Sequence, residues 1–264
     1  MYILDKIVAY KKDEVDQRRS EVSVSSLEKS QYFERSPLSL ATHLDESESY
    51  GIISEYKRRS PSKPKINLDA KAKDVIFSYA KNGASAISCL TDEHFFGGSN
   101  DYLTDGRNKV DIPILRKDFT VSEYQIIEAK AIGADAILLI AEVLSTDQIK
   151  SFTSTAQNLG LSVLLELHHE NELSKIDMNV DVIGINNRDL RTFKVDFNHS
   201  KRMFERLPDE ITKISESGIS DPKVVNELID TGFKGFLIGE YFMKTDDPGK
   251  ACGEFIGAIK SLRK

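Results

Sequence analysis

Residues that can give and take protons recur at the ends of short apolar runs in this sequence. Residues two positions apart in a strand share one face, so a glutamate at 55 and a lysine at 57 lie side by side. Lysines and carboxylates gathered around one substrate could act as general acids and general bases. The charged or amide residues at such positions are Glu55, Lys57, Lys117, Glu166, Asn186 and Glu216.

Most of these groups are preceded, two positions earlier, by an apolar or small residue. Leu115 precedes Lys117 in this way, and Leu164 precedes Glu166. The pattern puts each polar group on the inward face of its run, at the end. Contact with water would explain a single charged strand end. Several charged strand ends gathered in one place instead predict a functional site, because burying charges without partners costs several kcal/mol.

From residue 51 onward, strand patterns alternate with helical patterns. Glycines follow several helical segments, as a left-handed residue at a helix end commonly does. The predicted strands are Ile52–Lys57, Ala84–Leu90, Ile112–Arg116, Ala134–Ala141, Ser162–Leu167, Val180–Asn186, Ile211–Glu216 and Gly235–Gly239. The predicted helices are Ala70–Lys81, Val121–Ala131, Thr146–Asn158, Pro222–Asp230 and Pro248–Leu262.

Strands that are each followed by a connection predict an α/β fold, a (β/α)8 TIM barrel. We expect residues 51–264 to form the barrel. Residues 1–50 are expected to form an N-terminal helical extension of one or two helices packed on it, within a single domain overall. An open doubly wound sheet is the alternative, but its glycine-rich dinucleotide motif does not follow the first predicted strand.

Two glycine-containing turns predict a phosphate site. A TIM barrel places its active site at the C-terminal ends of the strands and often binds phosphate after the seventh and eighth. Here Ser217 and Gly218 follow the seventh predicted strand, and Gly239 and Glu240 lie at the end of the eighth. Glycine lets backbone N–H groups approach a ligand closely, and a helix N-terminus attracts anions. We therefore expect both turns to bind phosphate rather than to be ordinary connections.

Composition argues against several classes of protein. The net charge of −6 does not suit general nucleic-acid binding. No apolar run approaches the roughly 20 residues of a membrane span, and no signal-peptide pattern is present.

Cys89 and Cys252 lie far apart without metal-ligand spacing, so we expect two buried thiols, no metal and a cytoplasmic location. His168 and His169 also lack metal-ligand spacing and are predicted to begin a helix. We expect a monomer or a weakly associating homodimer.

Seven motifs occur in order along the chain. They are EYKRRSPSK (55–63), LTDEHFFGGS (90–99), PILRKDF (113–119), LLELH (164–168), IGINNRDL (183–190), SESGI (215–219) and LIGE (237–240). Together with ILDKIVAYKKDEV near the N-terminus, they resemble the indole-3-glycerol phosphate synthase family of tryptophan biosynthesis. The resemblance covers essentially the whole chain.

This resemblance implies a decarboxylating ring closure, the activity of a carbon–carbon lyase. The substrate would be 1-(2-carboxyphenylamino)-1-deoxyribulose 5-phosphate, and the products would be indole-3-glycerol phosphate, CO2 and water, with no cofactor. Two alternatives stay open. One is a phosphosugar aldolase that forms a Schiff base on Lys117 or Lys57, and the other is a barrel that only binds a phosphorylated metabolite.

The resemblance also implies roles for individual residues. Lys117 resembles the first general acid, Glu166 the base, and Lys57 the lysine that meets the substrate carboxylate and acts in dehydration. Glu55 and Glu216 would orient the lysines. Residues that would hold the rest of the substrate are Asn186, Arg188, Ser60, Phe96, Phe119, Leu138, Leu190 and Ile238. Those that would hold its phosphate are Ser60, Ser217, Gly218, Gly239 and the backbone of Glu240, which stands where some members have serine.

A lysine that acts as an acid near neutral pH needs a lowered pKa. Burial and a nearby cation both lower the pKa of a lysine. We therefore expect Lys57 and Lys117 to lower each other's pKa, with the carboxylates keeping them in position.

Overall fold

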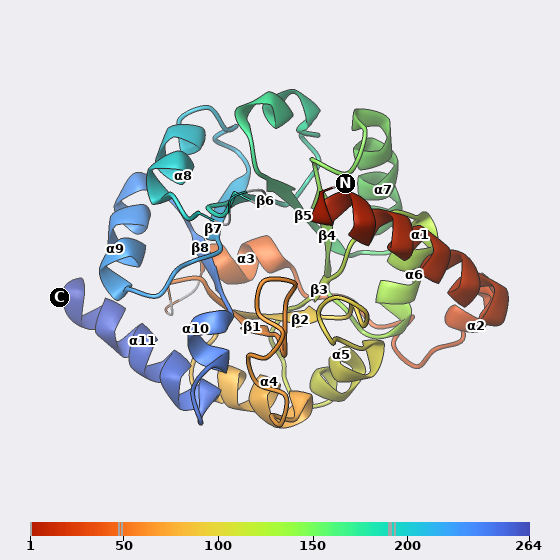
Figure 1. The fold of residues 1–264 in the computed structure, drawn as a ribbon, viewed down its shortest axis with the longest axis horizontal. Helices are drawn as coiled ribbons and strands as arrows, with labels where there is room; N and C mark the ends of the chain where they lie inside the picture. Colours follow the sequence, from red (N-terminus) through yellow and green to blue (C-terminus); the bar gives the residue numbers. More distant parts are fainter. Residues whose placement is uncertain (1, 47, 49, 190–191, 193) are drawn as a thin grey trace.

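The computed structural model describes residues 2–46, 48, 50–189, 192 and 194–264. Within these residues, parallel strands close into a barrel in which each strand pairs with the next and the last pairs with the first. Helices surround the barrel (Figure 1), so the expected TIM-barrel fold is confirmed. The strands are β1 (Ile52–Tyr56), β2 (Ala86–Leu90), β3 (Ile114–Lys117), β4 (Ala136–Ile140), β5 (Ser162–Leu167), β6 (Val182–Asn186), β7 (Thr212–Glu216) and β8 (Gly235–Ile238).

Strand side chains alternate between two apolar cores. On β1, Ile53 belongs to the cluster inside the barrel, whereas Ile52 and Tyr56 belong to the cluster between the barrel and its helices. Parallel strands covered on both faces are apolar almost throughout. Glu55 shares the inward face with Ile53, which places its carboxylate at the C-terminal mouth of the barrel.

Helices form the outer layer around the strands. They are α4 (Ala72–Lys81), α5 (Asn100–Arg107), α6 (Glu123–Ala131), α7 (Thr146–Asn158), α8 (Phe197–Phe204), α9 (Pro222–Thr231), α10 (Glu240–Met243) and α11 (Pro248–Leu262). Every helix and strand that was predicted is observed within two residues at either end. None of the described helices combines the length and apolar character that a membrane span requires.

Among the described residues, three short helices were not predicted, namely α5, α8 and α10. The helix expected to begin at His168 and His169 is observed as a 3-10 helix at Glu170–Lys175, for which His169 occupies the capping position. The sequence of α5 contains Gly106, and glycine is a poor helix former. The structure explains this glycine, because a Cβ at 106 would lie 2.6 Å from Ile76 on α4. Close packing of α5 on α4 therefore outweighs the low helix propensity.

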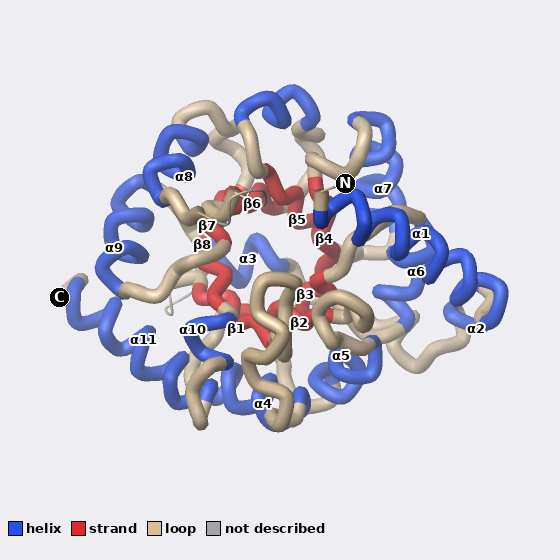
Figure 2. The backbone as a smooth tube through the Cα atoms, viewed as in Figure 1, coloured by secondary structure: helices blue, strands red, loops and turns tan. Residues whose placement is uncertain are grey.

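Among the described residues, three helices precede β1, where one or two were expected. They are α1 (Ile3–Glu21), α2 (Val24–Leu27) and α3 (Leu40–Asp45). Figure 2 shows α3 through the ring of strands, across one end of the barrel. Leu40 and Leu44 join the inner core, and the backbone N–H of Leu40 donates to Ser162 Oγ at the start of β5, at 3.1 Å. α3 therefore closes the N-terminal end of the barrel, opposite the predicted site.

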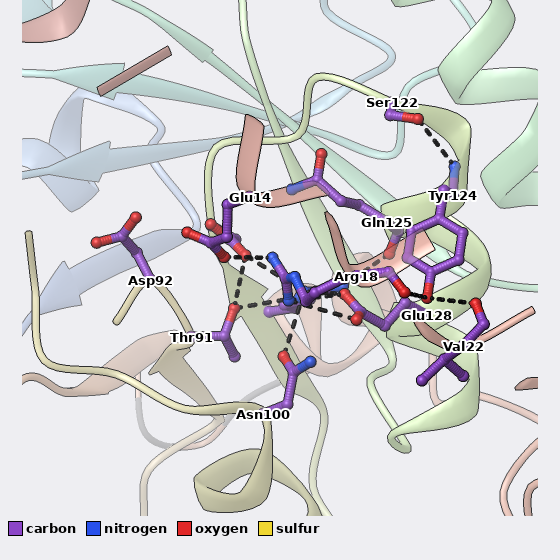
Figure 3. Close-up of polar contacts among 12 residues, drawn as sticks. Glu14, Arg18, Val22, Thr91, Asp92, Asn100, Ser122, Tyr124, Gln125 and Glu128 are labelled. Carbon is purple, nitrogen blue, oxygen red and sulfur yellow. Dashed lines mark hydrogen bonds and ion pairs between the residues drawn. The ribbon is translucent and has the colours of Figure 1, made fainter. Parts of the chain in front are cut away.

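Buried ion pairs hold α1 at the opposite end of the barrel from α3, where the C-terminal ends of the strands lie. Lys11 is fully buried, and its Nζ lies 2.9 Å from Asp92 Oδ2 and 3.0 Å from Asp118 Oδ1. Burial alone would raise the pKa of Asp118, but Lys11 lowers it below the usual value. Figure 3 shows the adjoining contacts, in which Arg18 donates to Glu128 on α6 at 3.1 Å. These ion pairs fix α1 beside the end of β3.

Candidate active site

A cavity of about 420 Å³ opens at the C-terminal ends of the strands. It brings together the predicted site residues, except that Leu190 lies outside the described residues. The predicted residues that line it are Glu55, Lys57, Ser60, Phe96, Lys117, Phe119, Leu138, Glu166, Asn186, Arg188, Glu216, Ser217, Gly218, Ile238, Gly239 and Glu240.

Lys117, the last residue of β3, lies among the charged groups of the cavity. Its Nζ donates to Glu166 Oε2 at 2.6 Å and to Glu216 Oε2 at 3.0 Å. On β6, Asn186 Nδ2 donates to the other oxygen of Glu166, Oε1, at 3.2 Å. Alternate strands β3, β5 and β7 therefore deliver one ammonium and two carboxylates to the same point.

The pKa of Lys117 is raised, which contradicts the sequence-based expectation that it is lowered. Burial lowers this pKa, but Glu166 and Glu216 raise it more. The expectation treated Lys57 as the neighbour that matters most, whereas the nearest charges to Lys117 are carboxylates and Lys57 pairs with Glu55. Lys117 is therefore an ammonium at neutral pH.

The two carboxylates beside Lys117 differ in protonation. Burial raises the pKa of Glu216 to about 7, and Lys117 offsets only part of this effect. Burial acts on Glu166 in the same direction, but Lys117 and a hydrogen bond from His168 hold its pKa well below the usual value. Near pH 7, Glu166 is therefore ionised, whereas Glu216 keeps its proton to a higher pH than an ordinary carboxyl does.

Glu55 and Lys57 form a second pair on the rim. Lys57 Nζ donates to Glu55 Oε1 at 2.5 Å, and Ser88 Oγ on β2 donates to Glu55 Oε2 at 3.3 Å. Gly239, which directly follows β8, leaves room for this carboxylate, because a Cβ at 239 would overlap Glu55 Oε1. The glutamate is buried, whereas the Lys57 side chain keeps 20% of its surface exposed toward the cavity mouth.

The turn after β7 has an unusual backbone. Ser217 and Gly218 both have left-handed φ angles, of 72° and 76°. That region costs a residue with a side chain roughly 1–2 kcal/mol. Strain of this kind is typical of ligand-binding turns. After β8, Glu240 begins α10, and its carboxylate pairs with Lys63, which ends the EYKRRSPSK motif but was not among the predicted site residues.

Apolar side chains form another part of the cavity wall. The ring centroids of Phe96 and Phe119 lie 5.9 Å apart, with an angle of 38° between the rings. α1 adds Ile3, Leu4 and Ile7 to the wall. Ile3 and Ile7 are four positions apart and so share one face of this helix, but their spacing alone does not say what that face packs against.

His168 is a further residue that sequence reasoning missed. Its Nε2 lies 2.7 Å from Glu166 Oε1. The signal was present, because residues two apart along an extended chain share one face. That spacing rule linked Glu55 to Lys57, whereas His168 was considered only as a metal ligand and as the start of a helix.

Solved structures of low sequence identity share the fold. The 3-hexulose-6-phosphate synthase from Salmonella typhimurium matches with a TM-score of 0.64 at 12% identity, covering 80% of this chain and 99% of that one. A mutant tryptophan synthase α-subunit from Pyrococcus furiosus matches with a TM-score of 0.61 at 14% identity, covering 80% and 98%.

Sequence comparison is more specific. An indole-3-glycerol phosphate synthase from Bacteroides thetaiotaomicron is 47% identical over 258 residues, which are 98% of this chain and 99% of that protein. One from Salinibacter ruber is 42% identical over 265 residues, covering 99% and 98%. The family model described as indole-3-glycerol phosphate synthase matches residues 4–255. The chain therefore belongs to the indole-3-glycerol phosphate synthase family.

Proposed function

We propose that this chain catalyses the decarboxylating ring closure of 1-(2-carboxyphenylamino)-1-deoxyribulose 5-phosphate. The products are indole-3-glycerol phosphate, CO2 and water. One observation carries the proposal: Lys117 lies hydrogen-bonded between Glu166 and Glu216 in a cavity that also has an aromatic wall and two glycine-containing turns. Membership of the family supports the same reaction.

Chemically different parts of the cavity support one orientation of the substrate. Phe96 and Phe119 offer apolar surface to the anthranilate ring. Ser217, Gly218 and the first N–H groups of α10 offer donors to the phosphate. Arg188 adds a cation to the same cavity. The other proposed contacts are Ser60, Leu138, Asn186, Ile238, Gly239 and the backbone of Glu240.

Ring closure needs a proton donor, because the ribulose carbonyl oxygen gains negative charge as the aromatic carbon attacks. Lys117 is the proposed donor, and its raised pKa keeps the proton on the ammonium at neutral pH. As Lys117 turns toward the carbonyl oxygen, it releases its hydrogen bond to Glu166. Loss of CO2 from the attacked ring carbon then restores aromaticity.

Dehydration needs a base and a second acid. The released Oε2 of Glu166 takes a proton from the CH2 group beside the amine, and Lys57 protonates the departing hydroxyl, so the indole keeps its N–H. Glu55 holds Lys57 at 2.5 Å, and Glu216 holds Lys117 at 3.0 Å, so each lysine keeps a carboxylate that orients it. Lys57 is also the proposed contact of the substrate carboxylate before it leaves as CO2.

The charge on Lys117 disfavours a Schiff-base aldolase that uses this lysine. A lysine must be neutral to attack a carbonyl, whereas the pKa of Lys117 is raised. Incubation with substrate and borohydride separates the two reactions. We expect indole-3-glycerol phosphate and unmodified protein by mass spectrometry. A reduced lysine adduct without the indole product would overturn the proposal.

We also propose that the enzyme works as a monomer in the cytoplasm on this small molecule. The barrel strands, the segments that follow them and α1 of a single chain supply the cavity wall, which supports a site that is complete without a second copy. Cys89 and Cys252 are free and buried, in keeping with a reducing compartment. Sedimentation velocity at assay concentrations tests the monomer, and a dimer at those concentrations would contradict it.

A further inference from the structure

His168 is a buried histidine to which the proposed reaction gives no role. It directly follows β5, and only 3% of its surface is exposed. Its Nε2 lies 2.7 Å from Glu166 Oε1. His168 is not among the described residues that line the cavity. Its ring therefore supports Glu166 from outside the cavity instead of contacting the substrate.

The two carboxylate oxygens of Glu166 have different partners. Oε1 faces His168 at 2.7 Å and accepts from Asn186 at 3.2 Å. Oε2 accepts from Lys117 at 2.6 Å. In the proposed reaction Lys117 turns to the substrate, while His168 and Asn186 keep their places. Oε2 is therefore the oxygen that becomes free to accept a proton.

His168 is itself held by its surroundings. Its backbone N–H donates to Glu172 Oε2 at 2.7 Å, and its carbonyl accepts from His199 Nε2 on α8 at 2.9 Å. Among the described atoms, its Nδ1 is buried without a hydrogen-bond partner. The hydrogen bond to Glu166 therefore sets the direction of the ring.

Charges on several elements face this pair. Burial lowers the pKa of His168, but Glu166, Glu172 and Glu142 raise it above the usual value. On the cavity side, Lys117 and Glu216 face Glu166. A donor on Oε1 favours the ionised form of Glu166, which is the form that a general base needs.

We propose that His168 is a positioning residue that holds Oε1 of Glu166 and thereby presents Oε2 to the substrate. The inference rests on the proposed role of Glu166 as the base. His168 transfers no proton in this account. Its effect is to limit the rotation of a flexible side chain, because small misplacements of a reacting group cost large factors in rate.

Substitutions at 168 separate this role from a merely structural one. His168→Leu removes the donor, and we expect kcat to fall about 10- to 100-fold with KM nearly unchanged. The acid limb of the kcat–pH profile should move up by about one to two pH units, because Glu166 loses a hydrogen bond that favours its charged form. His168→Gln retains an N–H donor and should restore most of both properties. His169→Leu, at the neighbouring position, is the matched control and should behave as wild type.

A well-folded His168→Leu variant with the wild-type kcat and acid limb would overturn the inference. Absence of turnover in the wild type would instead overturn the proposed function. The pairing can then still be tested by NMR, as it can if His168→Leu does not fold. In Glu166→Gln, the pKa of His168 should fall, because a carboxylate that raises it has been removed. An unchanged titration of His168 would show that the pair does not form.

Discussion

The absence of a side chain at Gly184 makes room for the carboxylate of Glu216. The two residues lie on the paired strands β6 and β7, and a Cβ on Gly184 would overlap Glu216 Oε1. The other oxygen of Glu216 accepts the hydrogen bond from Lys117 at 3.0 Å. The position of a proposed orienting group therefore depends on a glycine in the neighbouring strand.

Gly184→Ala should displace Glu216 and lower kcat/KM by about tenfold or more, because its contact with Lys117 is lost. Overpacking should also reduce the free energy of unfolding by about 1–3 kcal/mol. The matched control is Gly257→Ala on α11, where a Cβ would meet nothing within 4 Å. It should keep wild-type kinetics and gain about 0.5–1 kcal/mol in stability. Steady-state kinetics and denaturant unfolding measure both effects, and wild-type activity in Gly184→Ala would contradict the packing argument.

Relative to the wild type, Glu216→Gln should have a more favourable free energy of unfolding at neutral pH than at acid pH. The folded-state pKa of Glu216 is about 7, above the unfolded value of 4.5. As pH rises from 4.5 to 7, the unfolded chain ionises here first, so wild-type stability falls over that interval. Glutamine does not ionise and lacks this loss. The free energies of unfolding of both proteins at pH 4.5 and pH 8 test the sign of this effect. If the stability of Glu216→Gln relative to the wild type decreases as pH rises, the prediction is wrong.

Glu55 and Lys57 should show non-additive effects on activity. Lys57 Nζ lies 2.5 Å from Glu55 Oε1. Glu55→Gln and Lys57→Met should each lower kcat/KM strongly, and the double variant should lose less than the sum of the two. Coupling of about 0.5–3 kcal/mol is usual for groups in contact. Losses that simply add would show that the two residues act independently.

The turn at Ser217 and Gly218 should bind inorganic phosphate. An anion bound only by the folded protein raises its melting temperature by mass action. In Gly218→Ala, a Cβ would lie 2.6 Å from Val195 on a backbone with φ of 76°, so the turn must distort. We expect saturating phosphate to raise the melting temperature of the wild type and Gly257→Ala, but to raise that of Gly218→Ala less. Equal shifts of the melting temperature in all three proteins would show that phosphate binds at a different site.

The sequence was sufficient to predict the barrel, because each strand and most of the longer helices carry their own local pattern. The two-residue period also predicted the inward position of Lys117 and Glu166. The sequence could not predict the direction in which the pKa of Lys117 is shifted. The carboxylates nearest to Lys117 come from β5 and β7, and they reach it only when the barrel closes. The position of α1 could not be predicted either. It depends on contacts between residues that are far apart in the sequence, such as Lys11 and Asp118.

The most direct test is a single-turnover incubation with 1-(2-carboxyphenylamino)-1-deoxyribulose 5-phosphate, following indole fluorescence and released CO2 together. The wild type should form the two products in equal amounts. Lys117→Ala should slow both by about 10²–10⁴-fold, the usual loss when a general acid is removed. Because this change leaves Glu166 and Glu216 without their shared cation, thermal melting must show that the variant is folded. No indole from the wild type, or an undiminished rate in folded Lys117→Ala, would contradict the account.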